Sequence, residues 1–380
     1  MRGREERQKS MFIYMDVDDM VPQDHPLRAI RRRVDAALGR LSSAFNEVYS
    51  GEGRPSIPPE QLLKALVLQA LYAIPSERKL VEHIRFNVLY RWFLDLPLED
   101  RVFNHSTFSK NRERFEQKGL IRRFFDAVVR DAILDDYVSD EHFSIDGTLI
   151  QSWASLKSLR PLESDDKKVS DGSDDDDPSN PTVNFRGEKR GNKTHRSLTD
   201  PEARLMRKGD GRPALLSHSG HVLMENRRGL CVDVIIDEAN GRAERQAVSR
   251  MVKRVRQRHR SILVDTVGMD GGYVAGTDLD RWESEEAFVP HVPIPKRKIK
   301  GQSVGAKARR RARRRMQTVG YAISQRIRKR TEEIFGWFKV PGRLDRAAHI
   351  GRWKIQQQGW LVGATYNLVR MANLDMARAG

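Results

Sequence analysis

The spacing of apolar residues divides the chain into a helical first part and a second part that mixes strands and helices. Between residues 26 and 135, apolar side chains recur every three to four residues, which is the period of amphipathic helices. Pro58 and Pro59 suit the first turn of one helix, and Asn104 is a typical N-cap for another. We therefore predict a flexible arm over residues 1–25 and an α-helical N-terminal domain over residues 26–138.

The period changes near residue 141. Phe143, Ile145 and Leu149 alternate with polar residues, which is typical of a strand. The pattern that follows predicts a hairpin of two strands at 221–225 and 230–236, a helix over 242–257, a strand from 262 to 269, a short helix over 277–286, a strand at 287–289, and a last helix over 352–373. This order favours an α/β fold with a mixed sheet over residues 139–373.

Two charged stretches interrupt the second part. Residues 160–182 include the run from Asp174 to Asp177 and predict a solvated acidic loop, because like charges repel one another in a packed structure. Residues 296–315 carry about eleven Lys and Arg and predict a basic stretch outside the core. A long helix is expected to follow this stretch and to reach about residue 338.

Composition narrows the class of protein. The chain has 380 residues, 38% of them apolar, which suits two domains or one domain with a large insertion. The single cysteine, Cys231, excludes an internal disulfide framework and favours a reducing compartment. No apolar run is long enough to span a membrane.

The net charge of +17 predicts a polyanionic partner. A membrane surface is a poor candidate, since the basic stretch lacks interleaved Trp, Phe and Leu. Nucleic acid is the better one, with phosphate contacts from Arg309, Arg310, Arg311, Arg313, Arg314 and Arg315. Arg112 and Arg114 follow the predicted N-cap at Asn104 and are candidates for a helix-turn-helix reader. A helical bundle with a solvated basic face explains the same pattern equally well.

Three acids stand in separate contexts that suit one metal site. Asp146 and Asp270 each end an apolar strand-like run, and Glu332 lies on the basic helix. Functional side chains of open α/β sheets gather at strand ends, and carboxylates are the ligands that Mg²⁺ prefers. Three carboxylates can hold two such ions for phosphodiester chemistry. Taken singly, each acid is more simply a turn, cap or surface residue.

The predicted helix around the glutamate has two faces. Ile323, Ile327, Ile334 and Phe338 form one apolar stripe, while Glu332 lies on another face. We therefore expect the helix to pack on the sheet and still present the glutamate.

At these residues the chain resembles the transposases of the IS5 family of bacterial insertion sequences. The similar segments include 144–150, 220–227 and, most strongly, 328–339. The resemblance implies an RNase H-like catalytic domain, with Asp146, Asp270 and Glu332 as its catalytic and metal-binding acids. It also implies DNA contacts from Arg328 and Lys339, because those residues stand at the family's offsets from Glu332. The same offsets favour Glu332 over Glu333.

The resemblance implies a DNA transposase that cleaves at the ends of its element and joins them to target DNA. Its cofactor would be Mg²⁺, as two ions, with Mn²⁺ as a substitute. Its partners would be double-stranded terminal repeats and target DNA, bound by a homodimer or larger assembly at the bacterial nucleoid in the cytoplasm. The chain departs from the family at Gly271, where a lysine is usual, and at Gln325, where a tyrosine is usual.

Two other functions fit the same sequence. One is a non-catalytic or domesticated nucleic-acid-binding protein, which the high positive charge alone would explain. The other is an RNase H-like nuclease that cleaves DNA without joining it.

Overall fold

The computed structural model of the chain describes residues 16–49, 56–162, 183–185, 187–207, 212–240 and 243–379. Most of the predicted arm and nearly all of the predicted acidic loop lie outside these ranges. No helix within them is both long and apolar enough to cross a membrane.

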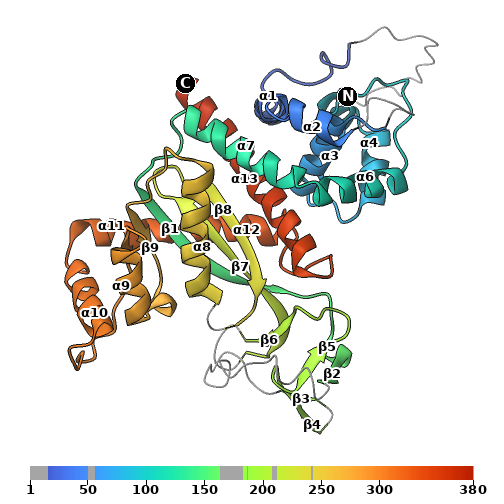
Figure 1. Cartoon of the computed structure of the whole chain (residues 1–380). Helices are drawn as coiled ribbons and strands as arrows, with labels where there is room; N and C mark the ends of the chain where they lie inside the picture. Colours follow the sequence, from blue (N-terminus) through green and yellow to red (C-terminus); the bar gives the residue numbers. More distant parts are fainter. Residues whose placement is uncertain are drawn as a thin grey trace, which may run out of the picture.

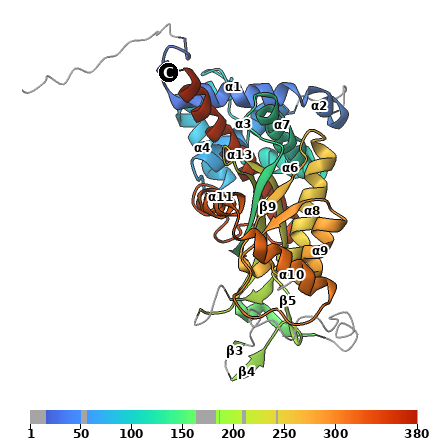
Figure 2. The same ribbon diagram turned by 90° about the vertical axis from the view of Figure 1, so that its left-hand side faces the viewer.

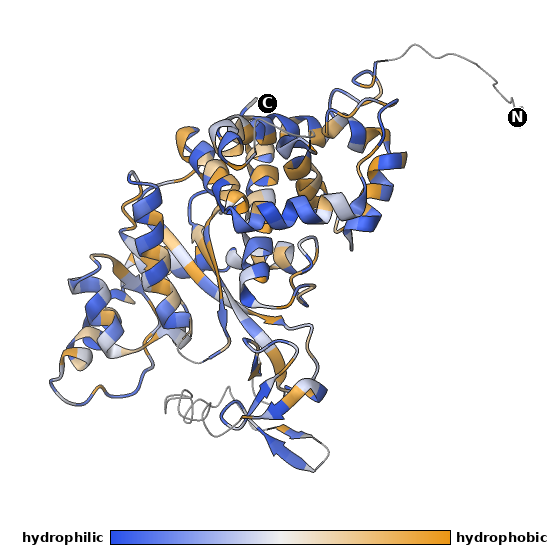
Figure 3. Cartoon of the chain, turned by 45° about the vertical axis from the view of Figure 1, so that its right-hand side comes forward, coloured by the Kyte–Doolittle hydropathy of each residue, from blue (hydrophilic) through white to orange (hydrophobic). Residues whose placement is uncertain are grey.

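The first part of the described chain is helical, as predicted. Asn104 caps its helix as expected, because its side chain accepts a hydrogen bond from the backbone nitrogen of Ser106. Hydrophobic and hydrophilic residues alternate along the helices, as amphipathic packing requires (Figure 3). The helices are α1 (Pro26–Gly39), α2 (Ser42–Val48), α3 (Pro59–Leu71), α4 (Glu77–Phe86), α5 (Val88–Phe93), α6 (His105–Gln117) and α7 (Leu120–Leu134).

A six-stranded mixed sheet follows the helices. Its strands are β1 (His142–Gln151), β6 (Arg204–Met206), β7 (Leu215–Glu225), β8 (Cys231–Glu238), β9 (Thr266–Gly268) and β10 (Val289–His291). β7 pairs antiparallel with β1, β6 and β8, whereas β9 is parallel to both β1 and β10. An antiparallel β1–β7–β8 unit extended by parallel β9 and β10 is the RNase H-like arrangement, which confirms the predicted fold class.

Helices cover both faces of this sheet (Figure 1). On one face lies α8 (Ala243–Arg258), whose Arg254 bonds to the carboxylate of Asp233 on β8. On the other lies α13 (Arg352–Ala379), where Gly359 and Gly363 approach the side chain of Val234 closely. Consecutive residues of β8 therefore face opposite helices, as the period of a strand requires.

Short elements complete the described chain. The pairs β2 (Leu159–Pro161) with β5 (His195–Ser197) and β3 (Val183–Phe185) with β4 (Glu188–Arg190) lie at the end of the molecule opposite the N-terminal helices (Figures 1 and 2). The remaining helices are η1 (Leu156–Ser158), η3 (Gly271–Tyr273), α9 (Gly276–Ser284), α10 (Val304–Arg315), α11 (Val319–Arg328) and α12 (Thr331–Lys339).

The structure corrects the prediction of one long helix and one apolar stripe before residue 338. The segment after residue 315 forms two helices, α11 and α12. Between them the backbone tightens into hydrogen bonds between residues three apart, from Arg330 N to Ile327 O at 2.8 Å and from Glu332 N to Lys329 O at 3.2 Å. This change of period turns the two halves relative to each other. Ile323 is consequently 43% exposed, while Ile334 is fully buried.

Candidate active site

The two aspartates lie side by side because their strands are parallel neighbours. Ser144 on β1 pairs with Gly268 on β9, so Asp146 and Asp270 each stand two residues beyond this pair. β9 ends there, and the Asp270 carboxylate caps the short helix η3 by accepting a 2.9 Å hydrogen bond from Gly272 N. Asp146, by contrast, lies within β1, which continues because β7 pairs with it as far as Gln151. The prediction that Asp146 ends its strand was therefore wrong.

Asp146 is held by three donors. Its Oδ1 accepts a hydrogen bond from Gly147 N at 2.8 Å, and its Oδ2 accepts from Arg328 Nη1 at 2.9 Å and from Thr331 Oγ1 at 3.2 Å. Burial raises the pKa of Asp146, the Gly147 hydrogen bond and the Arg328 charge lower it, and the neighbouring Asp270 charge raises it. The net effect is a raised pKa of Asp146, because burial and the Asp270 charge disfavour the ionised carboxylate more than its donors stabilise it.

Helix α11 fixes the backbone around these acids. Gln325 Nε2 donates to the carbonyl oxygens of Met269 at 3.1 Å and His291 at 2.7 Å, at the ends of β9 and β10. One turn later, Arg328 reaches Asp146. Gln325, which replaces the tyrosine expected from the resemblance, thus holds the residue that immediately precedes Asp270.

Glu332 does not join the two aspartates in this structure. Thr331 faces Asp146, and its neighbour Glu332 is exposed, because consecutive helical residues point about 100° apart. Glu333 points elsewhere, with its carboxylate 3.8 Å from Arg370 Nη1. Within the described ranges, no three His, Cys, Asp or Glu side chains are grouped so that they can hold a metal ion.

Another acid, which the sequence reasoning did not single out, lies beside the aspartates. Glu244 stands in the first turn of α8. Its Oε2 lies 2.9 Å from where a Cβ on Gly272 would be, and Asp270 Oδ1 lies 3.1 Å from the same point. The sequence feature that could have pointed to Glu244 is its place at the start of the helix that follows the predicted hairpin.

Two family models match the chain over separate ranges. One, described as a transposase domain of the DUF772 type, matches residues 15–114, and the other, a transposase DDE domain, matches residues 194–368. The chain is a DDE transposase. It is therefore an enzyme of phosphoryl transfer on DNA, of a class that generally uses divalent metal ions. Asp270 and Glu332 fall within the second match, and Asp146 lies between the two.

No curated protein matches the transposase. A solved structure with some similarity is the cryo-EM structure of the piggyBac transposase synaptic complex with hairpin DNA. It is 9% identical, with 93% of this chain and 76% of that chain covered, at a TM-score of 0.36. A similarity this weak adds nothing to the description of the fold.

The basic stretch of the transposase is mostly engaged within the protein. Ala306, Ala308 and Ala312 form the buried face of α10, so the run packs as a helix despite its charge. Arg311 and Arg315 pair with acids of α9, and Arg310 and Arg313 donate to backbone carbonyls between residues 295 and 301. Arg309 and Arg314 are exposed and make no hydrogen bond or ion pair with the described residues.

The predicted DNA-contacting residues outside this stretch are in different environments. Arg112 is paired with Glu77 at 2.7 Å and with Glu116 at 3.4 Å. Arg114 is exposed, with its guanidinium 5.5 Å from the centre of the Tyr49 ring. Arg328 contacts Asp146 in this structure, and Lys339 is half-exposed at the end of α12.

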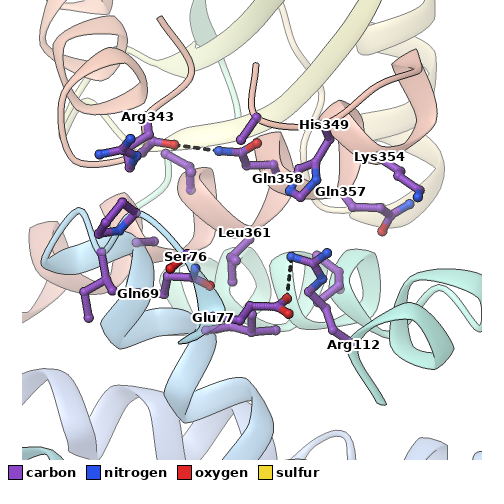
Figure 4. Close-up of a pocket in the computed structure, with 18 of the residues that line it drawn as sticks. Gln69, Ser76, Glu77, Arg112, Arg343, His349, Lys354, Gln357, Gln358 and Leu361 are labelled. Carbon is purple, nitrogen blue, oxygen red and sulfur yellow. Dashed lines mark hydrogen bonds and ion pairs between the residues drawn. The ribbon is translucent and has the colours of Figure 1, made fainter. Parts of the chain in front are cut away.

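A cavity of about 320 Å³ with both polar and apolar lining lies away from the aspartates, where the N-terminal helices meet the segment after α12 (Figure 4). Glu77 and Arg112 bond across it, and Gln358 donates to the Gly342 carbonyl at 2.8 Å (Figure 4). Burial lowers the pKa of His349 to about 4, with Arg112 and Lys354 acting in the same direction. Neither Asp146 nor Asp270 lines this cavity, so it is separate from the candidate active site.

Proposed function

We propose that Asp146 and Asp270 bind two Mg²⁺ ions between them, for which Mn²⁺ can substitute, and that Glu332 completes the site when DNA is bound. The parallel pairing of β1 and β9, which puts the two aspartates at the same level, is the observation that carries this proposal. Glu332 immediately follows Thr331, whose hydroxyl already contacts Asp146. To bring its carboxylate to the same place, α12 would have to turn by about the 100° that separates consecutive helical residues.

The residues present fit divalent ions. The donors are carboxylate oxygens, the hard ligands that Mg²⁺ requires. The Arg328 guanidinium on Asp146 is a positive group standing where a cation would stand. Glycine at position 272 also leaves space between Asp270 and Glu244 that a side chain would fill.

Each residue then has a defined task in phosphoryl transfer. The bound ions would activate the attacking oxygen and stabilise the leaving one. Asp146 and Asp270 would hold the ions, and in the described structure Thr331 bonds to the Asp146 carboxylate. Arg328, once displaced from Asp146, is free to contact a DNA phosphate, which suits its proposed role in DNA binding. No separate side-chain base is needed.

The proposed substrates are the terminal inverted repeats of the protein's own element and a target DNA. The N-terminal helices would bind the repeats, with Arg114 as an exposed basic residue of α6. Because both ends must be held together for joining, we expect a homodimer or larger assembly on DNA. The similar segments favour the IS5 family, and hence a place at the bacterial nucleoid in the cytoplasm.

Replacing Asp146 by Asn tests this function. Asp146→Asn keeps the size of the side chain but removes the charge that a cation needs, so Mg²⁺-dependent cleavage of repeat DNA should fall at least a hundredfold while DNA binding persists. Asp140→Asn, an exposed residue just before β1, is the matched control and should leave cleavage unchanged.

The same assays separate the other functions. Undiminished cleavage by Asp146→Asn would refute the assignment of the metal site. Cleavage by the unmodified protein without joined products would indicate a nuclease. Salt-sensitive binding with no cleavage in Mg²⁺ or Mn²⁺ would indicate a binding protein.

A further inference from the structure

We propose that Glu244 is a positioning residue of the transposase active site, whose carboxylate holds water molecules bound to the cation on Asp270. The inference rests on the proposed function, because it assumes that Asp146 and Asp270 carry the metal. It adds a carboxylate from α8 to the two aspartates and the glutamate of α12.

The carboxylate of Glu244 spans the residues next to both aspartates. Its Oε2 lies 2.9 Å from the Cβ position of Gly272, two residues after Asp270, and its Oε1 lies 3.6 Å from that of Gly147, directly after Asp146. Each oxygen thus faces the segment that carries one of the aspartates. A side chain at residue 272 would push this carboxylate aside, so the glycine leaves room for Glu244 in its present position.

Two buried polar atoms around this carboxylate have no hydrogen-bond partner among the described residues. Tyr273 is fully buried, and its hydroxyl has no hydrogen-bond partner among the described residues. Burial raises the pKa of this hydroxyl most, and the charges of Glu244, Asp146 and Asp270 raise it further. A buried hydroxyl that is unpaired within the protein calls for a partner such as an ordered water.

His221 gives the second unpaired atom. This residue is fully buried on β7, and its Nε2 bonds to Ser219 Oγ at 3.0 Å. Its Nδ1 has no partner among the described residues and lies 3.2 Å from the Cβ position of Gly147, the same point that Glu244 Oε1 approaches. His221 on β7 and Tyr273 on η3 thus each contribute a polar atom, unpaired among the described residues, to the surroundings of Glu244. These atoms favour an ordered water there.

Water-mediated contact suits this geometry better than direct ligation. In the described structure the three carboxylates are not grouped closely enough to ligate one ion. Mg²⁺ dehydrates reluctantly and usually keeps several of its waters. A carboxylate one water further out can accept hydrogen bonds from those waters and so fix the ion, as outer-shell partners of metal sites do.

Binding of Mn²⁺ to the full chain without DNA, followed by electron paramagnetic resonance, tests the inference directly. Glu244→Gln should weaken Mn²⁺ binding by roughly 10- to 100-fold, the usual effect of losing an outer-shell partner. Gly272→Ala should weaken it similarly, because the added methyl displaces the carboxylate. Glu285→Gln, an exposed glutamate at the end of α9, is the matched control and should bind Mn²⁺ like the unmodified protein.

The outcomes distinguish this inference from the proposed function. Unchanged Mn²⁺ affinity in Glu244→Gln, with binding lost in Asp270→Asn, would overturn the role of Glu244 alone. Unchanged affinity in both variants would overturn the proposed metal site itself. Thermal unfolding of each variant is measured alongside, and a loss of Mn²⁺ affinity at an unchanged unfolding temperature supports positioning over a structural role.

Discussion

At the scale of single residues, the positive charge of Arg328 stabilises the two neighbouring aspartates of the candidate active site. Asp146 and Asp270 repel each other, and Arg328 offsets this repulsion from α11. The side chains of Arg328 and Asp146 are 21% and 20% exposed, so their ion pair is partly desolvated and stronger than a surface pair. A divalent cation must therefore compete with Arg328 for Asp146.

This competition gives a prediction for Arg328→Gln. Without DNA, the variant should bind Mn²⁺ about tenfold more tightly, because no guanidinium has to be displaced, and a tenfold change corresponds to about 1.4 kcal/mol. Cleavage of DNA should nevertheless fall, since the proposed phosphate contact is lost. Titration with Mn²⁺ by electron paramagnetic resonance measures the first effect. Arg326→Gln, an exposed arginine of the same helix, is the control, and equal affinities in the two variants would contradict the competition.

At the scale of elements, α10 divides its arginines between packing and solvent. Arg311 bonds to Asp280 and Glu283 at 2.7 Å, which ties α10 to α9. Arg309 and Arg314 point into solvent without contacts to the described residues. The sequence run is uniform in charge, so only the structure separates the residues that hold the helix from those available to DNA.

The division predicts different effects for two sets of variants. Replacing both Arg309 and Arg314 by Ala should weaken DNA binding without lowering the unfolding temperature. It should also reduce the slope of log affinity against log salt by about 2, since each lost phosphate contact removes about 0.9. Arg311→Ala should instead lower the unfolding temperature. Filter binding across a salt series and calorimetry measure the two effects, and an unchanged salt slope in the double variant would count against this surface.

Local periodicity was sufficient to predict β1, β7, β8, β9 and β10 of the main sheet, but not β6 or the short pairs β2–β5 and β3–β4. The alternation around Phe143 and Ile145 gave β1, and the hairpin of β7 and β8 followed from its two apolar runs and the turn ending at Gly229. The pairing of β1 with β9 is a tertiary contact between distant segments, so periodicity alone did not establish it. Local periodicity did not establish the position of Glu332 either, because that position depends on the tight turn between α11 and α12.

At the scale of the whole molecule, α13 joins the N-terminal helices to the sheet (Figure 1). Asn367 bonds to the backbone of Cys231 on β8, with its Oδ1 2.9 Å from the nitrogen and its Nδ2 2.7 Å from the oxygen. Two turns later, Asp375 accepts hydrogen bonds from Arg33 on α1 and from Tyr137. One helix thus packs on the catalytic sheet and on the region proposed to bind DNA.

This arrangement predicts that residues 139–380 do not fold properly on their own. α13 packs against α1, α3 and α7, and it buries Leu368 and Met371 completely, so removing residues 1–138 leaves a broad apolar surface in water. Each fully buried side chain of this kind contributes about 1.5–3 kcal/mol, and the total stability of a domain is only about 5–15 kcal/mol. We expect the fragment to bind a hydrophobic dye, to lose near-ultraviolet circular dichroism and to aggregate, while the full chain unfolds in one transition. A monomeric fragment that unfolds cooperatively would instead mean that the sheet and α13 are stable without the N-terminal helices, and that the two parts are linked only for DNA binding.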